Sequence, residues 1–202
     1  GNPGKFLRVD GTMIARGTAE QPIIFTTNSI SNAMWSGLRF TESALDATYD
    51  AEGNYVAGSV LQHVELGYAD VAANLSTRAP YIADSAFRSN GTSIQIGNSN
   101  NGGSPHIERN TFTGSGSAIL LYGGQPLIHQ NSFVGVTNAI GNNNTGGSSG
   151  SPRILENVFR NGSGTSIQIG GSPTIVGNVI QGNSGTAISI SCCYSSPVIR
   201  DN

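Results

Sequence analysis

The segment 41–55, TESALDATYDAEGNY, holds the densest group of ionisable residues in the chain. Its carboxylates, with the arginine just before it, are Glu42, Asp46, Asp50, Glu52 and Arg39. Asp50, Glu52 and Asn54 alternate around Gly53, a spacing that can wrap oxygen ligands around Ca²⁺, and Asp46 could add another. The sequence therefore predicts a calcium site at Asp46, Asp50 and Glu52, with an acid–base site or a merely solvated acidic loop as alternatives. Ca²⁺ is the one cofactor that we consider, and none is required.

A second group of charged residues recurs at fixed places in later segments. Glu108 and His129 occupy equivalent positions, and so do Asp84 and Arg109. An acid beside a base, with a charged clamp next to them, could transfer protons. Opposite charges on neighbouring strands are also ordinary cross-strand pairs, each worth under ~1 kcal/mol on an exposed sheet. We favour the second interpretation.

The other residue types that bind metals do not gather. His63, His106 and His129 share no equivalent position, so a histidine metal site is not expected. Cys192 and Cys193 are adjacent and are too few for a disulfide framework, so their redox state stays open.

Composition limits what kind of protein can position these side chains. Only 11% of the residues are Asp, Glu, Lys or Arg, against roughly 25% in ordinary soluble domains. The net charge is -2 and no basic cluster is present, which argues against nucleic acid as a partner. The longest apolar run, 118–122, is too short to insert into a membrane. The 28 glycines and the lack of a 3.6-residue apolar period indicate a mostly β chain with many tight turns.

Internal repeats determine the expected architecture. Prolines at 80, 105, 126, 152, 173 and 197 recur every 21 to 26 residues. Two residues after each proline stands an isoleucine, five residues after it an asparagine or Ser85, and seven residues after most of them a phenylalanine or Ile180. Apolar residues alternate with small or polar ones, which is the pattern of a strand. Because such a unit cannot bury its apolar positions alone, we expect the units to stack as a solenoid of parallel strands.

The column of asparagines predicts a ladder inside this solenoid. Its members are Asn110, Asn131, Asn157, Asn178 and Asn202. An asparagine at a sharp bend tolerates a left-handed backbone, and its amide can bond to the asparagine of the next coil. We therefore expect the asparagines themselves to take the left-handed conformation at the bend.

The units SPHIERNTF, QPLIHQNSF, SPRILENVF and SPTIVGNVI, with the GTSIQI-type strands after them, resemble the parallel β-helix repeats of the pectin-lyase-like superfamily. The segments 11–28, 35–40 and 60–69 resemble the opening coils of bacterial and archaeal surface proteins of this type. The resemblance covers nearly the whole chain. It implies one all-β domain over 1–202: a single-stranded right-handed parallel β-helix of about eight coils and three sheets, the hand usual for parallel crossovers.

In carbohydrate-cleaving members of this superfamily the substrate groove runs along one sheet, which the resemblance identifies with GLRF, SIQI and their equivalents. If Leu38 and Phe40 face inward, the residue between them faces solvent. The outward row is then Arg39, Asn74, Gln95, Leu120, Gly141, Gln168 and Ser189. We predict Arg39, Asn74, Gln95 and Gln168 as substrate-binding residues. Because the row lacks the two carboxylates of a glycosidase and the calcium-binding carboxylates of a lyase, no catalytic residue is predicted.

These observations predict a secreted or cell-surface rod, a structural or adhesive module that contacts polysaccharide or other surface proteins without catalysis. One alternative is a polysaccharide lyase or glycosidase with a site near Arg39 and the acidic segment. Another is a subunit that associates end to end into a filament, since neither end of the sequence has an evident cap. We also expect the 202 residues to be a segment of a longer protein.

Overall fold

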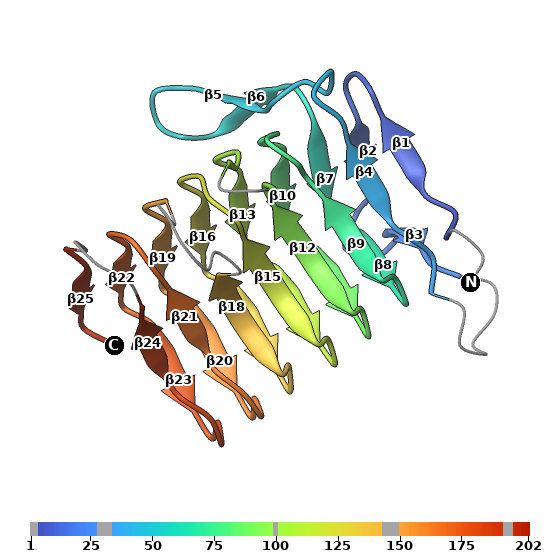
Figure 1. The fold of residues 1–202 in the computed structure, drawn as a ribbon. Coiled ribbons are helices and arrows are strands. Elements are labelled where there is room, and N and C mark those ends of the chain that lie inside the picture. The colour runs from blue at the N-terminus through green and yellow to red at the C-terminus, as the bar shows by residue number, and fades with distance from the viewer. Residues whose placement is uncertain (1–3, 28–33, 99–100, 143–149, 192–195) are drawn as a thin grey trace.

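The computed structural model describes residues 4–27, 34–98, 101–142, 150–191 and 196–202. This part of the chain contains strands and no helix, and the strands stack as a parallel β-solenoid (Figure 1). Most coils have three short strands, one in each of three parallel sheets that we name A, B and C.

Sheet A consists of β1 (Leu7–Val9), β4 (Leu38–Phe40), β9 (Val71–Asn74), β12 (Thr92–Ile96), β15 (Ser117–Leu121), β18 (Asn138–Asn142), β21 (Ile167–Ile169) and β24 (Ile188–Ile190). Sheet B consists of β2 (Ile14–Arg16), β7 (Val60–Gln62), β10 (Tyr81–Ala83), β13 (His106–Glu108), β16 (Leu127–His129), β19 (Arg153–Leu155), β22 (Thr174–Val176) and β25 (Val198–Arg200). Sheet C consists of β3 (Ile23–Phe25), β8 (Val64–Gly67), β11 (Ala86–Arg88), β14 (Thr111–Thr113), β17 (Ser132–Val134), β20 (Val158–Arg160) and β23 (Val179–Gln181).

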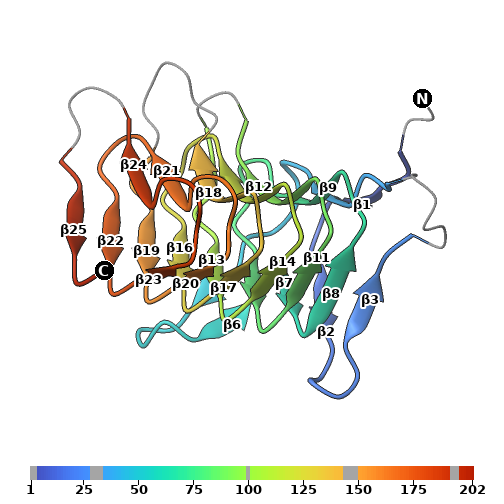
Figure 2. The same cartoon turned by 90° about the horizontal axis from the view of Figure 1, so that it is seen from below.

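One insertion interrupts this pattern between β4 and β7. It contains the antiparallel hairpin of β5 (Thr48–Tyr49) and β6 (Tyr55–Ala57), which lies outside the stack of coils (Figures 1 and 2). The insertion contains the acidic segment singled out above. From β9 to β23 five consecutive coils follow with three strands each and no added strand.

The predicted columns of apolar residues form the core. Ile82, Ile107, Ile128, Ile154 and Ile175 pair in register along sheet B and are fully buried. Phe87, Phe112, Phe133 and Phe159 stack along sheet C with ring centroids 4.9, 4.9 and 4.8 Å apart. Each coil thus covers the apolar positions of the coil before it, which is why a repeat of little more than 20 residues can build a core.

The asparagine ladder is confirmed. The side-chain oxygen of Asn131 accepts hydrogen bonds from the backbone N–H of Asn110, at 2.9 Å, and from its amide, at 3.1 Å. The same pair of bonds joins Asn131 to Asn157, Asn157 to Asn178, and Asn178 to Asn202. Each amide from Asn110 to Asn178 also donates to the backbone carbonyl of a core isoleucine. The polar groups inside this bend are thereby satisfied by one another.

The prediction that these asparagines adopt the left-handed conformation is wrong. The residue just before each ladder position has the positive φ, from 50° to 68°: His63, Asp84, Arg109, Gln130, Glu156, Gly177 and Asp201. A bend needs only one left-handed residue, and here it directs the side chain of the next residue inward. The asparagine is therefore selected for its buried amide rather than for its backbone.

The fold class is confirmed as all-β with three parallel sheets and an internal asparagine ladder. Among the described residues, no helix is long and apolar enough to cross a membrane.

Candidate functional site

The outward row of sheet A is in the predicted register. Leu38 and Phe40 are buried while Arg39 between them is exposed. Backbone pairing then places one outward residue of each coil beside the next: Arg39, Asn74, Gln95, Leu120, Gly141, Gln168 and Ser189. We call these residues the sheet A column, and we include in it Arg8, which pairs with Arg39 on the preceding strand. Its side chains are spaced by the strand separation of about 4.8 Å, so the structure brings the four predicted binding residues onto one face.

Sequence reasoning missed Arg8, which pairs directly with Arg39 on the first strand of sheet A. The available signal was the triplet Leu7-Arg8-Val9, which repeats the pattern of β4. The Arg8 Nε lies 2.8 Å from an Asp10 carboxylate oxygen. The Arg39 guanidinium lies 4.2 Å from the centre of the Phe6 ring, where the ring face attracts the cation. Two guanidinium groups therefore neighbour each other at one end of the column.

The side-chain amides of the column use only part of their hydrogen-bonding capacity within the described residues. The Asn74 side-chain oxygen accepts a bond from the backbone N–H of Ser76, at 3.1 Å. The Gln95 amide donates to the Gly97 carbonyl at 3.4 Å, and Gln168 is exposed. Such groups can exchange hydrogen bonds with hydroxyls, and the arginines can bind carboxylates.

The acidic residues of the insertion have separate tasks. Glu42 accepts hydrogen bonds from Ser76, at 2.6 Å, and from Thr77, and these bonds hold the pKa of its carboxyl below the usual range. Asp46 accepts a bond from the Ala79 N–H at 2.8 Å. Both side chains tie the base of the insertion to the loop after β9.

Asp50 closes the hairpin turn instead. Its carboxylate accepts bonds from the Asn54 amide at 3.0 Å and the Asn54 N–H at 2.7 Å, and these bonds lower its pKa. It also accepts a bond from the N–H of Glu52, whose side chain is exposed. Within the described residues, no three or more His, Cys, Asp or Glu side chains are grouped so that they could hold a metal ion. The calcium site at Asp46, Asp50 and Glu52 stays a prediction without a preassembled set of ligands.

The hairpin packs onto the outer face of sheet B. The Tyr49 ring stacks on the His106 imidazole, with centroids 3.9 Å apart and planes at 20°. The Tyr55 ring stacks on Tyr81 at 5.6 Å and 15°. Sequence reasoning treated the insertion as a loop, although its two tyrosines were a signal for a packed face. The hairpin thus reaches over its own coil to the next two.

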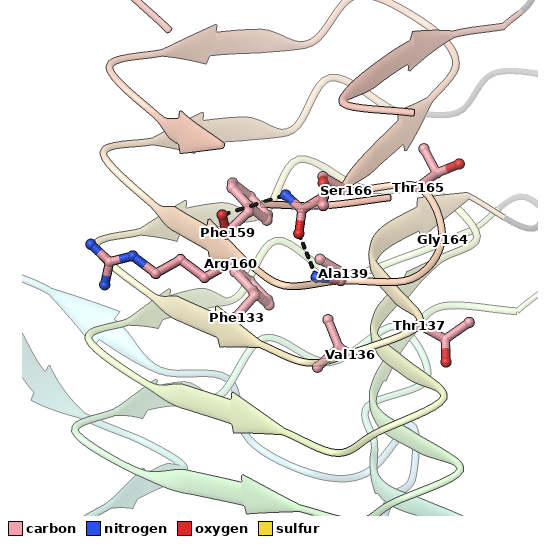
Figure 3. Close-up of a pocket in the computed structure, with 11 residues that line it drawn as sticks. Phe133, Val136, Thr137, Ala139, Phe159, Arg160, Gly164, Thr165 and Ser166 are labelled. Carbon is pink, nitrogen blue, oxygen red and sulfur yellow. Dashed lines mark hydrogen bonds between the residues drawn. The ribbon is translucent and has the colours of Figure 1, made fainter. Parts of the chain in front are cut away.

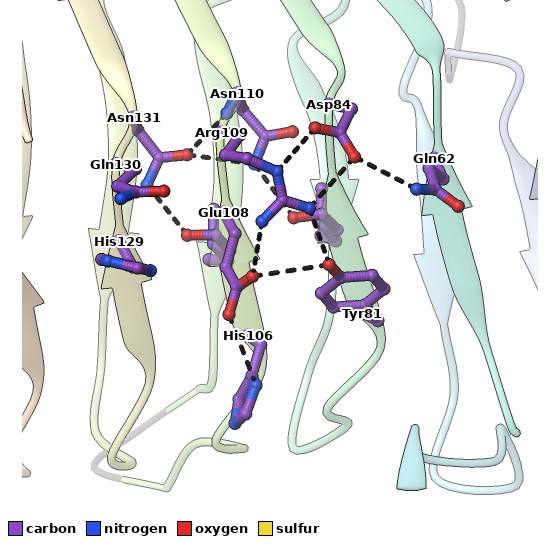
Figure 4. Close-up of polar contacts among 12 residues, drawn as sticks. Gln62, Tyr81, Asp84, His106, Glu108, Arg109, Asn110, His129, Gln130 and Asn131 are labelled. Carbon is purple, nitrogen blue, oxygen red and sulfur yellow. Dashed lines mark hydrogen bonds and ion pairs between the residues drawn. The ribbon is translucent and has the colours of Figure 1, made fainter. Parts of the chain in front are cut away.

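Beside the hairpin, sheet B carries a cluster of charges centred on Arg109 (Figure 4). Arg109 donates two hydrogen bonds to Asp84, at 2.7 and 3.1 Å, one to Glu108 at 3.0 Å and one to the Tyr81 hydroxyl at 3.0 Å. The Gln62 amide completes the shell of Asp84 at 3.1 Å. The predicted pairing of Asp84 with Arg109 is therefore confirmed.

Glu108 and His129 are neighbours in register, but their side chains bind other partners. The His129 Nε2 lies 3.3 Å from Glu156, whereas Glu108 binds Arg109. Burial raises the pKa of Asp84, but the bonds from Arg109 and Gln62 outweigh it and leave the pKa below the usual range. Burial also raises the pKa of Tyr81. At neutral pH the cluster therefore holds an ionised aspartate and a protonated tyrosine, which suits structure better than proton transfer.

Comparison with protein-family models, curated proteins and solved structures found no match. The structure itself shows a parallel β-helix repeat protein.

We expect the outer face of sheet B, where the hairpin covers His106, to make the protein less stable as the pH drops from 7 to 5.5. Burial lowers the pKa of His106, Glu108 opposes the shift and Arg153 adds to it. The unfolded chain therefore binds a proton at His106 near pH 6.5, whereas the folded chain binds that proton only at a lower pH. Replacing His106 with Phe, which keeps a ring under Tyr49, should reduce the drop in melting temperature between pH 7.5 and 5.5. The carboxylates with lowered pKa lose their contribution to stability only as the pH falls through the ordinary carboxyl range of about 3.9–4.3 and below, outside this window. An equal drop in both proteins would contradict the assignment.

A small space also lies inside the solenoid between β17 and β20. Phe133, Val136 and Phe159 line it, and its volume is about 10 Å³ (Figure 3). The side chain of Asn183 closes it by bonding to the Gly162 N–H and the Phe159 carbonyl. This volume holds one water at most, so the space is a packing defect and no ligand site.

The two cysteines of the sequence, Cys192 and Cys193, lie outside the described residues. The uncharged loops at 97–104 and 141–151 also fall partly outside them, at 99–100 and 143–149.

Proposed function

We propose that the chain is a secreted or cell-surface β-helical rod of the pectin-lyase-like type that contacts polysaccharide through the sheet A column and has no catalysis of its own. The supporting observation is the register of the column, which presents one outward side chain from each coil in a straight row. A row of this kind suits an extended chain of repeating units better than a compact ligand.

The charge of the column favours an acidic polysaccharide. Arg8 and Arg39 lie opposite each other on neighbouring strands, and the single carboxylate of Asp10 beside Arg8 offsets only one of these two positive charges. The rest of the column offers neutral amides and a hydroxyl, which suit sugar hydroxyls. No carboxylate is in the column, and glycoside hydrolysis needs two of them. Binding without cleavage is therefore the function we propose.

Affinity electrophoresis against polygalacturonate tests this proposal. We expect the double variant Arg8→Ala/Arg39→Ala to weaken binding about tenfold, because two charge-assisted contacts are lost. Salt should weaken the binding of the unchanged protein as well. Arg160→Ala is the matched control, since Arg160 is an exposed arginine on sheet C whose side chain makes no hydrogen bond to the residues that the structure describes. Equal retardation of the unchanged protein and the double variant would contradict the proposal, and so would cleavage of the polymer.

The enzyme alternative has one observation in its favour, the cluster of Glu108, Arg109, Tyr81 and His106 on sheet B. It brings acidic, basic and hydroxyl groups together beside a hairpin. Because the Arg109 guanidinium donates hydrogen bonds to both Asp84 and Glu108, neither carboxylate is free to act as a general base. Depolymerisation that is abolished by Glu108→Gln would favour this alternative over the rod.

End-to-end association into a filament is a further alternative that we propose to test. A sedimentation coefficient that rises with protein concentration would support association, and a constant monomer value would exclude it.

A further inference from the structure

A groove of about 500 Å³ lies where the chain passes from sheet B to sheet C. Its wall is the loop between β2 and β3, which projects beyond the later turns (Figure 2). A tight turn stiffens this loop, since the Thr18 N–H donates to the Gln21 carbonyl at 3.1 Å and the Thr18 hydroxyl accepts from the Gln21 N–H at 3.0 Å. Each of the next three coils passes from sheet B to sheet C by a single bend, at His63, Asp84 and Arg109. These bends form the floor of the groove beside the projecting loop.

Two ion pairs line the floor, and they differ in what they leave free. Arg109 uses its Nε and both terminal nitrogens on Asp84, Glu108 and Tyr81, so it has little left to offer. The Arg88 Nε lies 3.1 Å from a Glu65 carboxylate oxygen, and the Arg88 side chain is 50% exposed. In the described part of the chain, the two terminal nitrogens of Arg88 make no other hydrogen bond, and neither does the His63 ring. Arg88 and His63 therefore line the groove with nitrogen atoms that make no hydrogen bond within the described residues.

The balance of charge determines which ligand fits. The two arginines are matched by Asp84 and Glu65, so an anionic ligand would meet two carboxylates and a cationic one two guanidinium groups. Neighbouring hydroxyls suit such a site, because each can accept from Arg88 and donate to Glu65. Ala19 and Pro22 of the wall add apolar contact area. The volume lies within the range of small-molecule sites, about 300–1,000 Å³.

We propose that this groove binds a short segment of a neutral saccharide, with Arg88 and Glu65 as the hydroxyl-binding residues. The site is separate from the sheet A column, whose two arginines suit an acidic polymer. It therefore stands whether or not the column binds polysaccharide.

The test uses NMR titration of the whole chain with neutral oligosaccharides, namely those of cellulose, xylan, starch and galactan, and with oligogalacturonate as the acidic probe. We expect at least one neutral oligosaccharide to shift the amide signals of residues 18–22, 63–65 and 88. Arg88→Ala and Glu65→Gln should each weaken this binding about tenfold, because each removes a hydrogen bond to a charged group. Ala19→Trp should block it as well, since it fills the groove from an exposed position and leaves both ion pairs intact.

Arg160→Ala controls for the loss of an exposed arginine from the same sheet. Arg8→Ala/Arg39→Ala should leave neutral binding unchanged, so a failure of the column and a failure of the groove can be told apart. The proposal is overturned if none of the neutral probes shifts these amides, or if neutral binding survives all three groove variants in chains that are folded by circular dichroism. Preferential binding of oligogalacturonate in the groove would also overturn it.

Discussion

Asn131→Leu should destabilise the protein by about 2–6 kcal/mol, as measured by urea unfolding. Asn131 is 1% exposed, and its side chain serves both neighbouring coils. Leucine has a similar size but no polar atoms, so the Asn110 N–H loses its acceptor and the Ile107 carbonyl loses its donor. Each buried group left without a partner costs about 1–3 kcal/mol. Because the asparagine bonds to the rung on either side, the loss should also reduce the cooperativity of unfolding.

The matched control is Asn74→Leu, an asparagine outside the ladder that is half-buried and accepts one hydrogen bond, from the Ser76 N–H. Water can replace the one bond that this change removes, so we expect less than half the effect. A cost below about 1 kcal/mol at Asn131 would mean that the ladder does not carry the stability that its geometry suggests.

Phe112→Ala should cost about 3–5 kcal/mol, the usual range for removing a buried phenylalanine. The ring is fully buried and lies between Phe87 and Phe133, with interplanar angles of 14° and 6°. Parallel coils fix the backbone on both sides, so the neighbouring rings cannot close the space that the ring leaves. Thermal melting followed by circular dichroism measures the effect.

Phe6→Ala provides the comparison, because Phe6 is 47% exposed and contacts Arg39 rather than the core. It should cost under about 1 kcal/mol. Similar losses at both positions would show that the stacked rings of sheet C are no more tightly packed than the surface.

The regular coils could be predicted in detail because one physical demand repeats in every unit. Each Ile, Asn and Phe must lie over its copy, so the offset from proline alone gives the pairing of Ile107 with Ile128 and of Phe112 with Phe133. The backbone of the bend could not be read in this way. Asparagine is common in left-handed positions, and this tendency concealed that Arg109 and Gln130 occupy them instead.

Those parts of the candidate site that recur once per coil could be predicted from the sequence. The parts that occur in one coil only could not. The sheet A column follows from strand alternation, so Asn74, Gln95 and Gln168 were placed correctly. The other coils contain no equivalent of the insertion, so the distance from the repeated proline could not show that Tyr49 stacks on His106 of another strand. For Asp50, the sequence could not show that the carboxylate closes the hairpin turn, because a carboxylate that closes a turn and one that binds Ca²⁺ have the same local spacing.

The hairpin also bears on how force and unfolding spread along the solenoid. In a stack where coils touch only their neighbours, each coil can detach once the adjacent one has gone. Tyr55 against Tyr81 and Tyr49 against His106 tie the coil of β4 to the two coils that follow it. We therefore expect these three coils to unfold together under force, and the described coils from β15 onward, which have no such hairpin, to detach one at a time.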